Sequence, residues 1–423
     1  MMEVSIVETS KKFTGYTVAV GVSLTIFVTT GALGTFGVFL PHIVKDLGFP
    51  VAAVAFMATC ASTFCFLTNS IMSKVIDRIG PKLTMLIGAL LCALHYVIYG
   101  SATSLPIIYI GGAMGGISMG LATSAMASIV LTRWFVAKRE VVIGTVMATI
   151  GFGGSAFAFI AGQSIAAFGW RSAYYIIAAI IAIITVPVIL ILVKDSPEKI
   201  GQLPLGADSA VVVEKKVKEK GVPEAKTPCF WMVYIGMFFI GSLSPSIKFF
   251  MTSCWQGYGM DPVVSANYLS LALLLGAVGF PLAGGIAQKI GTRRTLTFLV
   301  AVFCLCMLFM YLSSSLNPVY IVLAAVCYAL SFPSQHLTSS LTTMEAFGPK
   351  AYGRLLGVFH GGAMFSSAFT SLIIGALKDA TGSYTPALIL LSITAVVSLI
   401  FLLIGFKLSP VEKERQLNAN ANV

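Results

Sequence analysis

Charged residues are scarce in this 423-residue chain: Asp, Glu, Lys and Arg together make up 10% of it, against 57% for hydrophobic residues. Ordinary soluble domains contain about 25% charged residues. A water-soluble protein of this length could not cover its surface with so few charges, whereas a bilayer favours apolar side chains on the outside as well. The composition therefore excludes an ordinary soluble fold and predicts an integral membrane protein.

Motifs for catalysis, metal binding and nucleotide binding are also missing. The eight cysteines form no Cys-x-x-Cys pair and lie almost entirely inside apolar runs, which is typical of small buried hydrophobic side chains. The Gly-rich segments at 111–120 and 151–154 lie within apolar runs, and we interpret them as sites of close helix packing. We expect no enzyme activity, no bound metal and no cofactor.

Acidic residues are absent from the middle of every apolar run, because all sixteen lie in tails, loops or run ends. Proton-coupled carriers often use a membrane-buried carboxylate as a relay. A coupled proton would here have to be carried by a His, whose ordinary pKa is about 6.5, or by the substrate itself. Exchange of one anion for another would need no proton site, so both modes of coupling stay open.

Apolar runs long enough to cross a bilayer, which takes about 20 residues, dominate the chain. They lack the alternation of strands, so we expect helices. The first run is too long for a cleavable signal peptide, whose apolar core is about 7–15 residues, and we interpret it as a retained span. The sequence predicts twelve transmembrane helices, at about 14–41, 51–73, 83–101, 105–131, 141–167, 172–193, 229–258, 263–287, 295–314, 318–342, 355–377 and 385–406.

Lys and Arg are distributed unequally between the two sides of the predicted membrane. With both termini in the cytoplasm, 23 of the 27 fall in cytoplasmic tails and loops, leaving Lys45, Arg171, Lys248 and Lys378 for the outer half. The positive-inside rule requires such an asymmetry. The net charge of +11 therefore reflects topology, and we expect a multi-pass protein of the cell membrane with cytoplasmic termini and no nucleic-acid partner.

One long polar segment, 195–228, divides the chain into two halves of six predicted helices. Its Pro, Gly and mixed charges predict a cytoplasmic linker between bundles at 1–194 and 229–423. The halves also resemble each other: SKVIDRIGPK at 73–82 corresponds to GGIAQKIGTR at 284–293, and three later glycines recur at an offset of 213 residues. The sequence thus predicts two six-helix pseudo-repeats.

The segment after the second predicted helix reads Ser-x-x-x-Asp77-Arg78-x-Gly80-Pro-Lys82. It resembles the loop signature of the major facilitator superfamily, Gly-x-x-x-Asp-Arg/Lys-x-Gly-x-Lys/Arg, with Ser in place of the leading Gly. The resemblance implies the major facilitator fold, and a latch between the halves formed by these residues and Arg133. The alternative is that the Asp77-Arg78 pair is ordinary cytoplasmic loop charge.

Other segments are similar to the oxalate/formate antiporter and monocarboxylate transporter branch of that family. They are GVFLPHIVKDLG at the end of the first helix, Arg133-Trp134-Phe135 after the fourth, and FGWRSAYY at 168–175. The branch is known for small organic anions. Its carboxylate carriers commonly place an Arg in the eighth helix, but 263–287 has no charged residue here. Oxalate, a dianion, is therefore disfavoured.

Ionisable groups at membrane depth are costly, which makes each a candidate for function. Lys248 is the only Lys or Arg within the apolar runs that the resemblance places on a cavity-facing helix. His336 and His360 follow, with Gln335 and Ser244 as polar neighbours. These five residues are the predicted substrate-binding set.

Each candidate has a structural alternative. The Lys248 side chain could instead snorkel to the outer surface. The two histidines could form hydrogen bonds between helices, and we expect that role for His95, which the resemblance places on an outer helix.

Taken as a whole, the sequence predicts a monomeric secondary transporter that moves a small organic anion, such as a monocarboxylate, by alternating access. Its partners would be that anion, the lipid bilayer and, in a symport mechanism, protons. The competing hypothesis is a carrier or efflux pump for a neutral or amphipathic compound, which the absence of an Arg in the eighth helix allows. A sensor built on the same fold would need a signalling domain, and the tails are too short for one.

Overall fold

The computed structural model describes residues 13–136, 139–206, 223–332 and 334–412, and within these ranges the chain is almost entirely helical. A single bridge between Phe135 and Leu205 is the only β-pairing in the described part. For a minority of helical residues, Gln335, His336 and His360 among them, the backbone is described but the side chain is not. The predicted all-α class is confirmed.

Thirteen α-helices make up the described chain. The first seven are α1 (Gly15–Leu33), α2 (Phe36–Leu47), α3 (Val51–Ile79), α4 (Pro81–Gly100), α5 (Leu105–Ala122), α6 (Ser124–Trp134) and α7 (Arg139–Leu192). The other six are α8 (Pro228–Gly257), α9 (Pro262–Ile290), α10 (Thr292–Leu312), α11 (Pro318–Ser331), α12 (Ser334–Thr381) and α13 (Thr385–Lys407).

The helices correspond to the twelve predicted crossings once their interruptions are considered. The pairs α1–α2 and α5–α6 are each one crossing broken by a short turn. The long helices α7 and α12 each hold two crossings that meet at Gly169 (φ 79°) and Gly348 (φ 70°), where a left-handed backbone suits glycine. α11 and the first part of α12 together form the tenth crossing.

Several predicted boundaries differ from the observed ones. The first run was predicted to end at 41, yet α2 continues through Pro41 to Leu47. Hydropathy indicates which part of a helix lipid covers, and the polar turn at the end of α2 adds no hydropathy although it is helical. In the described residues, eight stretches are by themselves long and apolar enough to cross a membrane.

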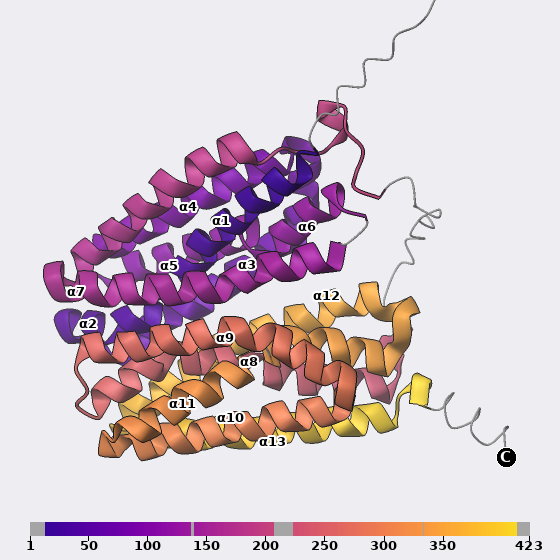
Figure 1. Cartoon of the computed structure of the whole chain (residues 1–423). Coiled ribbons are helices and arrows are strands. Elements are labelled where there is room, and N and C mark those ends of the chain that lie inside the picture. Colours follow the sequence, from indigo (N-terminus) through magenta and orange to yellow (C-terminus); the bar gives the residue numbers. More distant parts are fainter. Residues whose placement is uncertain (1–12, 137–138, 207–222, 333, 413–423) are drawn as a thin grey trace, which may run out of the picture.

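The helices form two groups, α1–α7 and α8–α13, that lie above and below each other in Figure 1. The main contacts between the groups, among the described residues, are those of α3 with α12, α7 with α9, and α2 with α8. The stretch between the groups includes residues 207–222, which lie outside the described residues. The division into two domains with a linker at 195–228 therefore stays a prediction.

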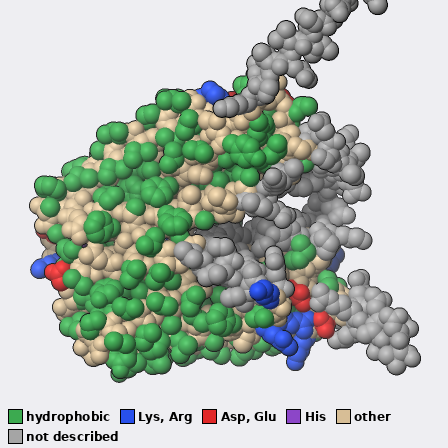
Figure 2. Space-filling view, viewed as in Figure 1, with side chains coloured by type: hydrophobic (Ala, Val, Ile, Leu, Met, Phe, Trp, Pro, Cys, Tyr) green, Lys and Arg blue, Asp and Glu red, His purple; other side chains and the backbone are tan. Residues whose placement is uncertain are grey.

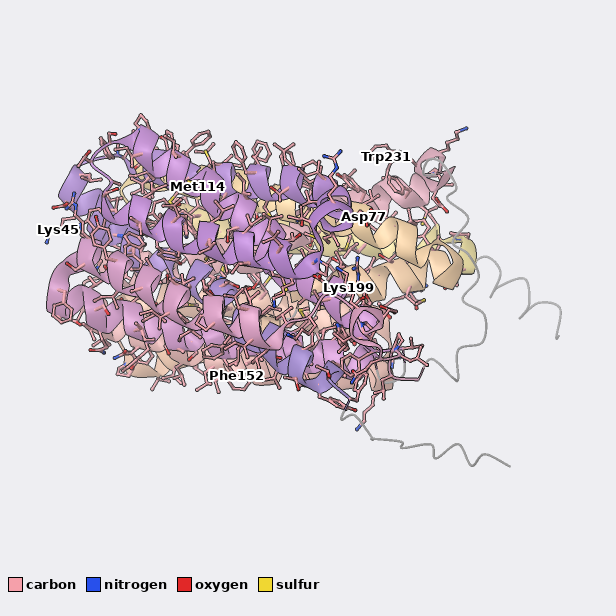
Figure 3. The ribbon with its side chains drawn as sticks, turned by 90° about the horizontal axis from the view of Figure 1, so that it is seen from above. Lys45, Asp77, Met114, Phe152, Lys199 and Trp231 are labelled. Carbon is pink, nitrogen blue, oxygen red and sulfur yellow. The ribbon has the colours of Figure 1, made fainter. Side chains whose placement is uncertain are left out.

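Charged side chains gather at the two ends of the molecule, while the middle of the face in Figure 2 is covered mainly by hydrophobic side chains. Figure 3 places Asp77 and Lys199 toward one end and Lys45 at the other. We call these the motif end and the opposite end. An apolar band between two charged ends is the surface that a bilayer requires.

The Gly-rich segments lie at close helix contacts, as the sequence predicts. A Cβ on Gly116 of α5 would stand 2.1 Å from the Ala61 carbonyl oxygen of α3. A Cβ on Gly153 of α7 would stand 2.1 Å from the Phe27 carbonyl oxygen of α1. Because small residues allow helix backbones to approach in the membrane, these positions determine how tightly the first group packs.

Candidate functional site

The first crossing is interrupted between α1 and α2. There the Gly34 N–H donates to the Gly31 carbonyl at 3.1 Å, and the Thr35 N–H donates to the Ala32 carbonyl at 2.9 Å. These bonds span three residues instead of the four of an α-helix, so the chain makes a tight turn within the apolar band. Irregular backbone at membrane depth is tolerated where it is covered by protein or lines a cavity.

Lys248 of α8 extends its side chain to this turn. A Cβ on Gly34 would stand 3.3 Å from Lys248 Nζ, so the ammonium group packs against the glycine face of the break. The Lys248 side chain is half-buried, and the described part of the chain offers it no ion pair. Its ammonium thus faces the other helix group, whereas snorkelling would direct it to the outer surface.

The side of Lys248 toward the opposite end is closed by contacts between α2 and α8. The Phe36 and Phe249 rings lie 4.6 Å apart between centroids. The Thr252 hydroxyl donates to the Gly37 carbonyl at 2.5 Å, and a Cβ on Gly37 would stand 2.4 Å from the Phe249 carbonyl oxygen. The two helices therefore touch through their backbones immediately beyond the Lys248 position.

The other predicted substrate-binding residues lie on α8 and α12. Ser244 is buried on α8, one helical turn before Lys248. Gln335 and His336 belong to the first part of α12, and His360 to the part after Gly348. The side chains of these three lie outside the described residues, so their place in the binding set stays a prediction.

The structure also locates two histidines outside that set. His95 is buried inside the first helix group, with Gly115 of α5 packed against its ring, whereas the hydrogen bond between helices that we expect of it stays a prediction. His42 of α2 was not among the predicted site residues, because it lies near the polar end of its helix. It lines a cavity of about 290 Å³ between α2, α7 and α9, together with Trp170 and Asp261.

The loop motif lies at the junction of α3 and α4, where Gly80 takes φ 81°. Asp77 and Arg78 are exposed, and within the described chain neither forms an ion pair. The Lys82 N–H donates to Asp195 Oδ1 at 3.0 Å, and Lys82 Nζ donates to the Leu190 carbonyl at 2.6 Å. The motif is thus anchored to the end of α7 in its own helix group, and the latch between halves stays a prediction.

Asp195 was missed by the sequence analysis, which treated it as linker charge. Burial raises its pKa, but hydrogen bonds from Lys199 Nζ (2.8 Å) and the Lys82 N–H outweigh burial, so the pKa falls below its ordinary value. Arg133 of α6 belongs to the same region. The pKa of Glu198 is lowered mainly by hydrogen bonds from the Ser196 side chain and from its own backbone. The positive charge of Arg133 lowers it further.

We expect Asp195→Asn to lower the stability of the folded protein by about 1 kcal/mol, because the carboxylate accepts charge-assisted bonds at a partly exposed site. A lowered folded-state pKa means that this contribution is present above the ordinary pKa of 3.8 and is lost as the pH falls. Thermal unfolding of the purified protein measures the effect. Glu198→Gln, on an exposed neighbour, is the control, and equal melting temperatures for Asp195→Asn and wild type would contradict the anchoring role.

The second half repeats this arrangement with other residues. Arg293, at the start of α10, donates to Glu412 at 2.5 Å and lies 3.7 Å from Glu345. In each half, an acidic residue that follows the last membrane crossing therefore binds the beginning of the third crossing of that half. Asp195 binds the start of α4, and Glu412 binds the start of α10. The shared position supports the pseudo-repeat that the sequence indicates.

Two groups of membrane-crossing helices, with the Lys248 ammonium at the boundary between them, are the arrangement of a membrane transporter. The chain belongs to the Major Facilitator Superfamily, whose sequence model matches residues 22–362. The fold and the relatives are those of transporters and not of enzymes. The expected major facilitator fold is thereby confirmed, and the chain is a multi-pass membrane protein.

Relatives of known name match at low identity. The phosphoglycerate transporter protein of Salmonella typhimurium is 26% identical over 372 residues, which cover 81% of this chain and 79% of that protein. Monocarboxylate transporter 13 of Bos taurus is 26% identical over 151 residues, 36% of this chain and 35% of its own length. The crystal structure of the nucleoside transporter NupG shares the fold with a TM-score of 0.72 and 14% identity, covering 93% of this chain and 99% of that one.

Proposed function

We propose that this transporter moves a small organic anion, a monocarboxylate, across the cell membrane by alternating access, as proton symport or anion exchange. The observation that carries the proposal is Lys248, whose ammonium reaches the break between α1 and α2 from the other helix group. Of the described residues, none supplies it with an ion pair. A carboxylate bound between the groups would supply the missing charge.

The energetics favour a transported anion over a permanent one. An unpaired ammonium in a water-poor site is unfavourable, and a carboxylate that hydrogen-bonds to it offsets much of that cost. The substrate can then leave when the site opens to water, since hydration replaces the contact. Two of the relatives, the phosphoglycerate and the monocarboxylate transporter, are named for anions. The oxalate/formate and monocarboxylate branch remains the subgroup that we propose for the chain.

Alternating access is supported by the unequal closure of the two ends. α2 and α8 meet through their backbones beyond Lys248, toward the opposite end. At the motif end, Asp77 and Arg78 are exposed. We infer a state in which the route from Lys248 to the opposite end is closed, and a second state in which the groups part there.

We further propose that the motif end faces the cytoplasm, because 23 of the 27 Lys and Arg residues belong to the tails and loops that the sequence assigns to that side. A cysteine introduced at Ser209, in the predicted linker and outside the described residues, should not react with an impermeant thiol reagent added to intact cells. It should react after permeabilisation. Labelling from outside in intact cells would reverse the orientation.

Uptake into proteoliposomes tests the proposed substrate class. We expect a radiolabelled monocarboxylate to accumulate and other carboxylates to compete for it, while the corresponding amides do not. Either an inward proton gradient or preloaded anion should drive uptake, which separates symport from exchange. The alternative is a neutral or amphipathic substrate, and the observation on its side is the contact between the Phe36 and Phe249 rings beside Lys248. Amides that compete as well as acids would support this alternative.

A further inference from the structure

Asp379, near the end of α12, binds the beginning of α3 in the other helix group. Its Oδ1 accepts a hydrogen bond from the Val51 N–H at 2.9 Å, and its Oδ2 accepts one from the Ala52 N–H at 2.7 Å. The first N–H groups of a helix have no partner within the helix, and its N-terminus carries partial positive charge. One carboxylate thus caps a helix across the boundary between the two groups.

The backbones around this contact are pressed together. Gly375, one turn before Asp379, packs so closely that a Cβ on it would stand 2.8 Å from Ala52 Cα. α3 and α12 form one of the two largest contacts between the helix groups. We call the contact between α3 and α12 a seam between the two helix groups. The capping bonds of Asp379 lie where this seam reaches the opposite end, so the groups cannot separate there without breaking them.

Among the described residues, the pseudo-symmetric seam between α7 and α9 has no carboxylate that caps a helix of the other group. Gly162 of α7 packs against α9, where its Cβ would stand 2.6 Å from Ala266 Cβ, as Gly375 packs on α3. At the 213-residue offset, however, Asp379 corresponds to Ala166, which has no hydrogen-bonding side chain. The N-terminus of α9 is capped from its own group by Asp261, whose Oδ1 accepts from Val263 and Val264 N–H at 2.8 and 3.2 Å.

The packing of the second seam also differs at this end. The cavity of about 290 Å³ lined by His42, Ala166, Trp170 and Asp261 lies here, beside the start of α9. In the described part of the chain, the α3–α12 seam is thus closed at the opposite end by the Asp379 carboxylate, whereas the α7–α9 seam contains this cavity near Ala166. Both seams pack helix closely on helix. The Ser270 hydroxyl of α9 donates to the Ser155 carbonyl of α7 at 2.9 Å, so the second seam is also joined by a hydrogen bond, but it has no carboxylate cap at the opposite end.

We propose that Asp379 is a gating residue of the transport cycle, which holds the opposite end closed by capping α3. The two N–H bonds must break before the groups part at that end, and they re-form when it closes. Asp77, at the other end of the same α3 helix, is exposed while Asp379 is bound, as expected when one end is closed and the other is not. This inference rests on the alternating-access part of the proposed function and does not depend on the substrate.

Distances between the two groups at the opposite end test the proposal. Spin labels at Thr103, in the α4–α5 loop, and Ser314, after α10, are on exposed positions of different groups. Full-length protein with its native cysteines replaced is measured in lipid nanodiscs by pulsed EPR. We expect Asp379→Ala to raise the ratio of long to short distances at least about fivefold, since charge-assisted hydrogen bonds are lost at an exposed site. Asp379→Glu should restore part of the short-distance population.

Asp261→Ala is the matched control, because it removes the same kind of helix cap within one group. It should leave the distance distribution unchanged, and thermal unfolding of both variants shows whether they fold. A distribution for Asp379→Ala that coincides with wild type would overturn the gating role. So would an equal shift in Asp261→Ala, because the effect would then come from loss of any cap. Since no substrate is needed, this test can fail while carboxylate transport stands.

Discussion

Lys248→Gln is expected to reduce carboxylate uptake at least about tenfold, because a hydrogen bond to a charged group contributes about 1.5–3 kcal/mol. The glutamine keeps a polar side chain of similar reach but cannot supply the positive charge that a carboxylate requires. Gly34 leaves room for the side-chain end, so the replacement should fit without displacing the turn between α1 and α2. Initial uptake rates in proteoliposomes, at equal amounts of reconstituted protein, measure the effect.

Two further variants make this prediction specific. Lys248→Arg should retain part of the uptake, since it keeps the charge but changes its geometry. Lys378→Gln is the matched control: the ammonium of this residue, near the end of α12, lies over the Tyr384 ring and donates to the Gly382 carbonyl, and its loss should leave uptake near normal. Uptake by Lys248→Gln within about twofold of wild type would rule out the role. The binding function would then pass to His336 and His360, or to a neutral substrate.

Gly37→Val should strongly reduce transport while the protein remains folded. A Cβ at this position would stand 2.4 Å from the Phe249 carbonyl oxygen and 3.0 Å from that of Lys248, and backbone atoms cannot move aside alone. α2 and α8 belong to different helix groups, so the clash is relieved when the groups part at the opposite end. The variant should therefore be held open at that end, with uptake reduced at least about fivefold if blocked closure costs the 1–3 kcal/mol typical of overpacking.

Gly116→Val provides the comparison within one helix group. Its Cβ would stand 2.1 Å from the Ala61 carbonyl oxygen, but α5 and α3 do not separate during the proposed cycle. We expect this variant to lose stability instead, with a lower melting temperature or little monodisperse protein. If Gly37→Val transported normally, or if it destabilised the fold as strongly as Gly116→Val, closure between α2 and α8 would not be part of the cycle.

The fold could be predicted from the sequence because bilayer solvation imposes its requirement on every crossing. Runs of about 20 apolar residues and the Lys and Arg asymmetry give the crossings and their order without any tertiary contact. The boundaries were less accurate: α2 runs six residues beyond the predicted end, and the fifth and sixth predicted crossings meet directly at the non-helical kink of Gly169. Hydropathy carries no information on such polar or tightly turned ends.

The site could be predicted only in part. Lys248 was identifiable because a charge in an apolar run is rare, whatever it contacts. The turn at Gly34 could not be identified, because the sequence contains 40 glycines. Only the structure shows that the Lys248 amine of α8 packs against this one. Asp195 and Asp379 were missed for the same reason. Their partners lie 113 and more than 300 residues away, and each appeared in the sequence as an ordinary charge at a helix end.

The most direct test of the central claim is equilibrium binding of one monocarboxylate and its neutral amide to purified wild-type and Lys248→Gln protein. If the substrate is recognised through the Lys248 charge, wild type should bind the acid at least about tenfold more tightly than the amide, and the variant should lose that difference. Equal affinities of wild type for acid and amide, or an undiminished preference for the acid in Lys248→Gln, would contradict it.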